Sequence, residues 1–129
     1  MTDLTILPDA EFDVMKIVWR AAEPISTVQV FNQSLAEKNW KLQTVMTLLM
    51  RLEKKGFVSS ERRGRERFYW PLVARDDYLN RETGLFVKRF HSNSISGLMG
   101  ALFGGKKPGA KELSEIEAWL KEQEEDSDV

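Results

Sequence analysis

The spacing of apolar residues predicts an amphipathic helix over residues 42–55, near the middle of the chain. Four apolar residues recur at i, i+3, i+4 and i+7, which places them on one helix face: Val45, Leu48, Leu49 and Leu52. Gly56 follows directly and can take the left-handed backbone conformation that ends many helices. The opposite face, called the recognition face below, holds six side chains able to contact phosphates or base edges: Gln43, Thr44, Thr47, Met50, Arg51 and Lys54.

A first helix is predicted over residues 10–22. Asp9 is placed to cap its N-terminus, and the pair Glu23-Pro24 is expected to end it. Its main apolar stripe consists of Phe12, Met15 and Trp19.

A second helix is predicted from Ser26 to about Lys38. Ser26 and Gln29 have the spacing of a capping box, in which each side chain bonds the other residue's backbone N–H. The expected buried stripe is Val28, Phe31 and Leu35. The connection to the central helix, about residues 38–42, is as short as a helix-turn-helix requires.

A β-hairpin is predicted over residues 57–71. Apolar side chains alternate with polar ones, as in half-buried strands, at Val58, Phe68 and Trp70. The turn is expected at Arg63-Gly64-Arg65, where Gly64 can take a positive φ. A helix-turn-helix followed by an arginine-rich hairpin is the outline of a winged helix.

Three further helices are predicted after Pro71, over about residues 76–90, 95–103 and 110–123, with a frayed end at 124–129. Helices of this length are marginal alone in water, so their apolar faces need a partner. The economical partner is a second copy of the chain, which gives a two-fold symmetric dimer. The residues expected at this contact are Tyr78, Leu79, Phe86, Phe90, Leu98, Leu102, Leu113, Ile116, Trp119 and Leu120.

The expected fold class is therefore mainly α with a small β-wing. Residues 1–73 are assigned to a winged helix-turn-helix DNA-binding domain. Residues 74–129 are assigned to a helical dimerisation domain with an acidic, frayed C-terminus.

Composition excludes several classes of protein. No run approaches the roughly 18 apolar residues of a membrane span, and the start, Met1-Thr2-Asp3-Leu4, lacks the features of a signal peptide. The expected location is the cytoplasm. The absence of cysteine excludes disulfides and thiolate metal sites.

Charge is distributed unevenly along the chain, although the formal net charge is only −1. Residues 40–70 hold eight Lys or Arg against three Glu, an excess of +5. Residues 111–129 hold two Lys against eight acidic residues, an excess of −6. The basic middle can meet a polyanion, although a charge run is also typical of a solvated face.

The recognition face and the hairpin supply the candidate DNA-binding residues. In the helix these are Gln43, Thr44, Thr47, Arg51 and Lys54, and in the hairpin Arg62, Arg63, Arg65 and Arg67. Arg51 suits a guanine or a phosphate, and either threonine suits a phosphate or a thymine methyl. The hairpin arginines suit phosphates, with one side chain in the minor groove.

Simpler interpretations stay open for the same residues. The threonines could serve only as helix formers, Arg51 could pair with Glu53 or with another neighbour on the helix, and the hairpin could be merely solvated. Lys54 could stabilise the C-terminal end of the helix dipole.

No enzyme, cofactor or metal site is predicted. His91 is the only histidine, and one histidine near a loop is a poor metal site and a poor catalyst. No serine–histidine–aspartate set, phosphate-binding glycine loop or pair of catalytic carboxylates is evident.

The motifs together resemble the penicillinase-repressor family (BlaI/MecI), which also includes the copper-responsive CopY branch. The resemblance covers about residues 9–120. Its motifs are Glu11-x-x-Val14-Met15-x-x-x-Trp19; Trp40-x-x-x-Thr44-Val45-x-Thr47-Leu48-Leu49-x-Arg51-Leu52-x-Lys54-Lys55-Gly56-Phe57; Gly64-Arg65; and Phe68-x-x-Pro71. It implies a homodimeric repressor that binds double-stranded DNA at a palindromic operator.

The resemblance also bears on the inducing signal, which stays open. Members of the β-lactam branch are released from DNA when a regulatory protease cuts the dimerisation domain, and the matching segment here is Leu98–Phe103. Copper-branch members sense metal through C-terminal cysteines, which this chain lacks.

A second hypothesis comes from a different class. A winged helix can serve as a protein-interaction module, with its basic face docking an acidic partner without specific DNA binding.

Overall fold

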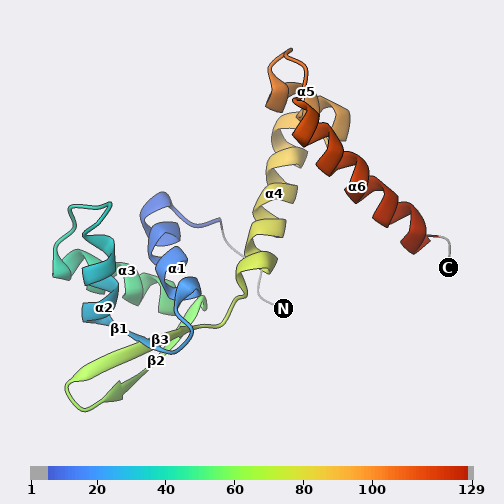
Figure 1. The fold of residues 1–129 in the computed structure, drawn as a ribbon. Helices are drawn as coiled ribbons and strands as arrows, with labels where there is room; N and C mark the ends of the chain where they lie inside the picture. Colours follow the sequence, from blue (N-terminus) through green and yellow to red (C-terminus); the bar gives the residue numbers. More distant parts are fainter. Residues whose placement is uncertain (1–5, 128–129) are drawn as a thin grey trace. The chain divides into compact units, whose positions relative to one another are not determined.

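The computed structural model describes residues 6–127 (Figure 1). The chain divides into two compact units, one that reaches Gly84 and one that begins at Leu85. The elements are α1 (Asp9–Arg20), β1 (Ile25–Ser26), α2 (Thr27–Ser34), α3 (Leu42–Lys54), β2 (Val58–Arg63), β3 (Glu66–Pro71), α4 (Arg75–His91), α5 (Ile95–Phe103) and α6 (Ala110–Ser127). The described part is mostly helical with one small sheet, as the sequence predicts.

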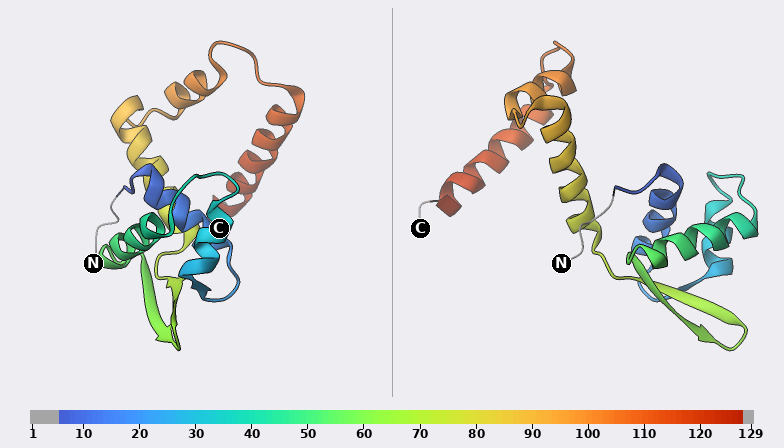
Figure 2. Two further views of the ribbon diagram at one scale, coloured as in Figure 1. Left: turned by 90° about the vertical axis from the view of Figure 1, so that its left-hand side faces the viewer. Right: turned by 180° about the vertical axis from the view of Figure 1, so that it is seen from behind.

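The sheet is antiparallel, with the strand order β1-β3-β2. The predicted hairpin is confirmed, and Gly64 has the expected positive φ of 68° at its turn. Figure 2 shows β2 and β3 extending away from the helices α1, α2 and α3. Strand β1 was not predicted, because it has only two residues, the second of which is the capping serine, and two residues are too few to show an alternating pattern.

The buried face of β3 differs from the prediction. Tyr69 is its buried residue, while Phe68 and Trp70 are only half-buried. Successive side chains of a strand point to opposite faces of a sheet. Tyr69 pairs with Ile25 of β1, and both residues are buried. Tyr69 therefore faces the core, whereas Phe68 and Trp70 point to the opposite face of the sheet.

Helices α1 and α3 supply most of the core. The predicted stripe of α3 is confirmed, since Val45, Leu48, Leu49 and Leu52 are all buried. The prediction that Asp9 caps α1 is wrong: Pro8 is the N-cap, no side chain bonds the helix end, and Asp9 is the first helical residue.

Helix α2 confirms its predicted start but not its predicted face. The capping box is present, with the Gln29 backbone N–H donating to Ser26 Oγ at 3.2 Å and the Ser26 N–H donating to Gln29 Oε1 at 2.9 Å. The helix ends at Ser34, and the buried residues are Val30 and Ser34, whereas Val28 and Leu35 are exposed. Burial of Ser34 is tolerated because its hydroxyl donates a hydrogen bond to the Phe31 carbonyl at 2.7 Å.

A partly buried ion pair joins α1 to the end of α3. Glu11 is buried, and Lys55 Nζ donates to its Oε1 at 2.5 Å. Lys55 therefore has a structural partner, whereas its neighbour Lys54 is exposed to solvent.

The beginning of α4 belongs to the core of the first unit through Tyr78. This side chain is only 1% exposed, and its ring lies 5.8, 5.8 and 5.6 Å from those of Phe12, Trp19 and Phe57. Its hydroxyl accepts a hydrogen bond from the Leu7 N–H at 2.8 Å, and burial raises its pKa to about 12. The aromatic ring and the hydroxyl both have partners inside the unit.

The prediction that Tyr78 lies at the dimer contact is therefore wrong, because a side chain buried in its own core is not available to a second copy. Leu79 is half-buried against the same core, and its place at the dimer contact stays a prediction. The boundary between residues 73 and 74 stays a prediction, with the amendment that the first turn of α4 packs on the winged-helix core.

The second unit exposes much of its apolar surface. Phe86 and Phe90 are 48% and 58% exposed, and their ring centroids lie 5.0 Å apart. Leu98 and Ile116 are half-buried, and the other predicted contact residues are exposed: Leu102, Leu113, Trp119 and Leu120.

Helix α6 is longer than predicted. Its backbone is helical to Ser127, so the expected fraying at residues 124–127 is wrong, and residues 128–129 lie outside the described part, as does the start at residues 1–4. Within residues 6–127, no helix is both long and apolar enough to cross a membrane.

Candidate nucleic-acid interface

The recognition face of α3 is open to solvent. Gln43, Thr44, Met50, Arg51 and Lys54 are exposed, and Thr47 is half-buried. The amphipathic spacing explains this exposure, because the four leucine and valine residues on the other side of the helix are held in the core.

Arg51 has its guanidinium free for a ligand. Within residues 6–127 it makes no hydrogen bond or ion pair, so the expected alternative, a pair with Glu53, is not formed. The Glu53 carboxylate instead accepts a hydrogen bond from Ser60 Oγ at 2.6 Å.

The Thr47 hydroxyl already has a partner. It donates to the backbone carbonyl of Gln43, one helical turn earlier, at 3.0 Å. Its proton is thus engaged within α3, which leaves the Oγ1 lone pairs as acceptors and the γ-methyl group for an apolar contact.

Three of the four hairpin arginines have neighbours within the wing. Arg63 Nε donates to Glu61 Oε1 at 2.5 Å, and its guanidinium lies 5.1 Å from the centre of the Phe68 ring. Arg62 Nε donates to the Gly64 carbonyl at 3.3 Å. The Arg67 guanidinium donates to Ser60 Oγ at 2.9 Å, and Ser60 Oγ in turn donates to the Glu53 carboxylate. The two bonds through Ser60 connect the wing to the end of α3.

Arg65 differs from the other three. It follows the turn residue Gly64, and no hydrogen bond or ion pair holds its guanidinium in the part of the chain that the structure describes. An exposed, unpaired arginine at the end of a projecting hairpin is well placed to bind a phosphate.

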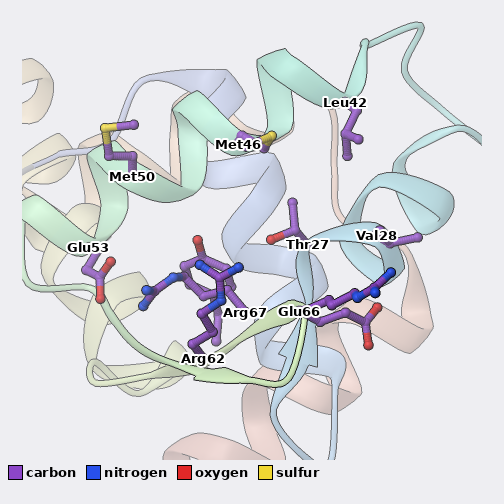
Figure 3. Close-up of a pocket in the computed structure, with 11 residues that line it drawn as sticks. Thr27, Val28, Leu42, Met46, Met50, Glu53, Arg62, Glu66 and Arg67 are labelled. Atoms are coloured by element: carbon purple, nitrogen blue, oxygen red, sulfur yellow. The ribbon is translucent and has the colours of Figure 1, made fainter.

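A groove of about 480 Å³ separates α3 from the wing (Figure 3). One wall is apolar, with Leu42, Met46 and Met50 at successive turns of α3, and the other carries wing arginines. The complete lining is Thr27, Val28, Leu42, Met46, Met50, Glu53, Arg62, Arg65, Glu66, Arg67 and Tyr69. Burial raises the pKa of the Tyr69 hydroxyl, which lines the groove beside these arginines.

Sequence reasoning missed the apolar wall of this groove. Leu42, Met46 and Met50 are spaced at i, i+4 and i+8, a signal that was present in the sequence. Of the three, only Met50 belongs to the predicted recognition face, whereas Leu42 and Met46 lie between that face and the core stripe.

No metal site was found among residues 6–127, where no three histidine, cysteine or acidic side chains gather. His91 is half-buried, and its ring lies 5.7 Å from that of Phe86.

A family model and individual relatives point to the same protein family. The family model described as penicillinase repressor matches residues 7–122. The penicillinase repressor of Bacillus licheniformis is 27% identical over 95% of this chain and 94% of its own length. The transcriptional regulator BlaI of Mycobacterium tuberculosis is 36% identical over 75% of this chain and 68% of its own length.

Two solved structures agree with the fold. The DNA-binding domain of the repressor BlaI has a TM-score of 0.53 and 33% identity, over 60% of this chain and 94% of that one. The Bacillus licheniformis BlaI monomeric form in complex with the blaP half-operator has a TM-score of 0.51 at the same identity and coverage. The predicted winged-helix fold is thereby confirmed.

Proposed function

Because the chain belongs to the penicillinase repressor family, a family of transcriptional repressors rather than enzymes, we propose that it acts as a dimeric repressor that binds a palindromic operator. The α3 recognition face and the wing carry the binding. The C-terminal helices hold two copies together, and the protein acts in the cytoplasm.

One observation carries the proposal most directly. Met50 of the recognition face and three wing arginines, Arg62, Arg65 and Arg67, border the same groove, so a duplex that receives α3 in its major groove meets the wing arginines at its backbone. The likeness to BlaI in complex with a half-operator supports this orientation.

The residues divide into two proposed roles. Base edges are read from α3 by Gln43, Thr44, Thr47 and Arg51. Phosphates are bound by Lys54, Arg62, Arg63, Arg65 and Arg67. The phosphate contacts give affinity and salt dependence, and the base contacts give sequence preference.

A dimer is proposed because the second unit exposes an apolar surface that one copy leaves uncovered. The proposed contact residues are Phe86, Phe90, Leu98, Leu102, Leu113, Ile116, Trp119 and Leu120. Two-fold symmetry would place the two α3 helices about one turn of B-DNA apart, roughly 34 Å, or a multiple of it.

A regulatory protease is proposed as a further partner, acting at Leu98–Phe103. This segment lies in α5, whose start is held by the Gly97 N–H bond to Ser94 Oγ at 2.9 Å. A protease binds its substrate in an extended form, so cleavage there requires α5 to unfold locally.

The base-reading role of Arg51 predicts a specific loss. Arg51→Ala should weaken operator binding by about 1–3 kcal/mol per half-site and relax the preference at one base pair, because a bidentate contact to guanine is removed. The measurement is competitive binding to a duplex that the full chain selects from a random 30-base-pair pool, called the selected duplex below, and to its single-base variants. Equal losses for all variants would assign Arg51 to a phosphate instead.

The wing predicts a different signature. Arg65→Ala should weaken binding to every duplex alike and reduce the slope of log K against log salt concentration by about one per protomer. Arg63→Ala is the matched control, and its effect should be smaller because Arg63 is engaged by Glu61. A slope that Arg65→Ala leaves unchanged would remove the wing tip from the interface.

The protein-interaction module remains the second candidate, since the same basic face suits an acidic partner. Binding of the full chain to the random pool separates the two functions. A module of this kind would enrich no duplex sequence, whereas a repressor would.

A further inference from the structure

The centre of the recognition face is a methionine rather than a polar residue. Met50 is 64% exposed, and three polar residues of the face surround it at i−7, i−3 and i+4: Gln43, Thr47 and Lys54. Its side chain contributes nothing to the buried core. A large apolar group at this position needs a reason, and the proposed function supplies the setting for one.

A methionine in the major groove has few ways to distinguish bases. Its thioether is a weak acceptor and it has no donor, so hydrogen bonds to base edges contribute little. The major groove offers one apolar group, the 5-methyl of thymine. The favourable contact of Met50 with a base edge is therefore with thymine.

Thr47, one turn before Met50, points to the same chemistry by an independent observation. Its hydroxyl donates to the Gln43 carbonyl at 3.0 Å, so that proton is not available to a base. The γ-methyl group of Thr47 and the side chain of Met50 are three residues apart and form neighbouring apolar groups on one helix face.

We propose that Met50, together with the Thr47 methyl group, forms an apolar site on α3 that reads the 5-methyl groups of thymines in each operator half-site. This inference rests on the proposed function, since it requires α3 to lie in the major groove. Arg51 and the wing arginines bind guanine and phosphates, whereas this apolar site makes binding depend on thymine methyl groups in the operator.

Replacement of thymine by deoxyuridine tests the site directly, because it removes only the methyl group. In the selected duplex, each thymine is replaced singly. At one or two positions per half-site, we expect the full chain to bind about fourfold more weakly, the equivalent of about 0.8 kcal/mol for burying one such group.

Variants then assign the penalty to the side chains. Met50→Ala should bind the thymine duplex about fourfold more weakly and should no longer distinguish deoxyuridine at one position. Thr47→Ser keeps the hydroxyl and should remove the penalty at a neighbouring position. Lys54→Ala, one turn further along the same face, is the matched control, and it should weaken both duplexes alike while keeping the penalty.

Three results would overturn the inference. One is a wild-type protein that binds every deoxyuridine duplex as well as the thymine duplex. Another is a penalty that persists unchanged at every position in Met50→Ala, which would show that Met50 does not contact a thymine methyl group. Either result leaves the proposed repressor function intact. The third is a random pool in which the full chain enriches no sequence, and this result would overturn both the thymine site and the repressor function.

Discussion

Replacing Phe90 with aspartate should convert the protein from a dimer to a monomer and weaken binding to the selected duplex by about 100-fold or more. Phe90 is 58% exposed and lies beside Phe86, with 5.0 Å between the ring centroids. A charge placed in an apolar contact loses hydration that a partner side chain does not replace. A monomer binds one half-site at a time, whereas a dimer binds both half-sites through two linked recognition helices. Loss of this linkage lowers the affinity by a factor of this size.

The measurement is sedimentation equilibrium of the full chain, followed by titration of the selected duplex. Lys121→Glu in α6 changes charge at an exposed polar position and should stay dimeric with nearly normal binding. Thermal unfolding of both variants checks that the winged-helix unit is intact. A Phe90→Asp variant that stays dimeric would place the contact elsewhere on the second unit.

Replacing Tyr78 with alanine should lower the free energy of unfolding of the winged-helix unit by about 3–5 kcal/mol, the usual range for a buried aromatic side chain. The substitution removes a ring that three other aromatic rings contact, together with the acceptor for the Leu7 N–H. Tyr78→Phe keeps the ring and should lose only about 1–3 kcal/mol, because a buried N–H is left without a partner.

The measurement is urea unfolding followed by circular dichroism at several protein concentrations. A core role predicts losses that do not depend on concentration, with alanine costing more than phenylalanine. A Tyr78→Ala variant with normal unfolding but weakened dimerisation would return Tyr78 to the dimer contact.

Local signals made part of this fold predictable. The i, i+3, i+4, i+7 spacing of α3, the capping box at Ser26 and the turn at Gly64 each depend on residues close together in the chain. Such features need no knowledge of the rest of the fold, and the structure confirms all three.

The misassigned features depend on distant partners. Tyr78 belongs to the core because Phe12, Trp19 and Phe57 surround it, and no local pattern places these residues together. Helix α2 buries Ser34, whereas helix spacing predicts that Leu35 is buried. A serine can lie in the core when its hydroxyl has a hydrogen-bond partner, which here is the Phe31 carbonyl.

The candidate site shows the same division. Helix periodicity was sufficient to group the residues of the recognition face. It could not show that the Thr47 hydroxyl is already bonded, that Glu53 bonds Ser60 rather than Arg51, or that Arg65 alone among the wing arginines has no partner in the described part of the chain. These contacts decide which side chains are free to bind DNA.

Operator recognition by a dimer is tested most directly by a hydroxyl-radical footprint of the full chain on the selected duplex. A symmetric dimer predicts two protected half-sites of inverted sequence on one face of the duplex, with centres separated by about 10 base pairs or a multiple of that spacing. A single protected site without internal symmetry, or uniform protection along the duplex, would contradict it.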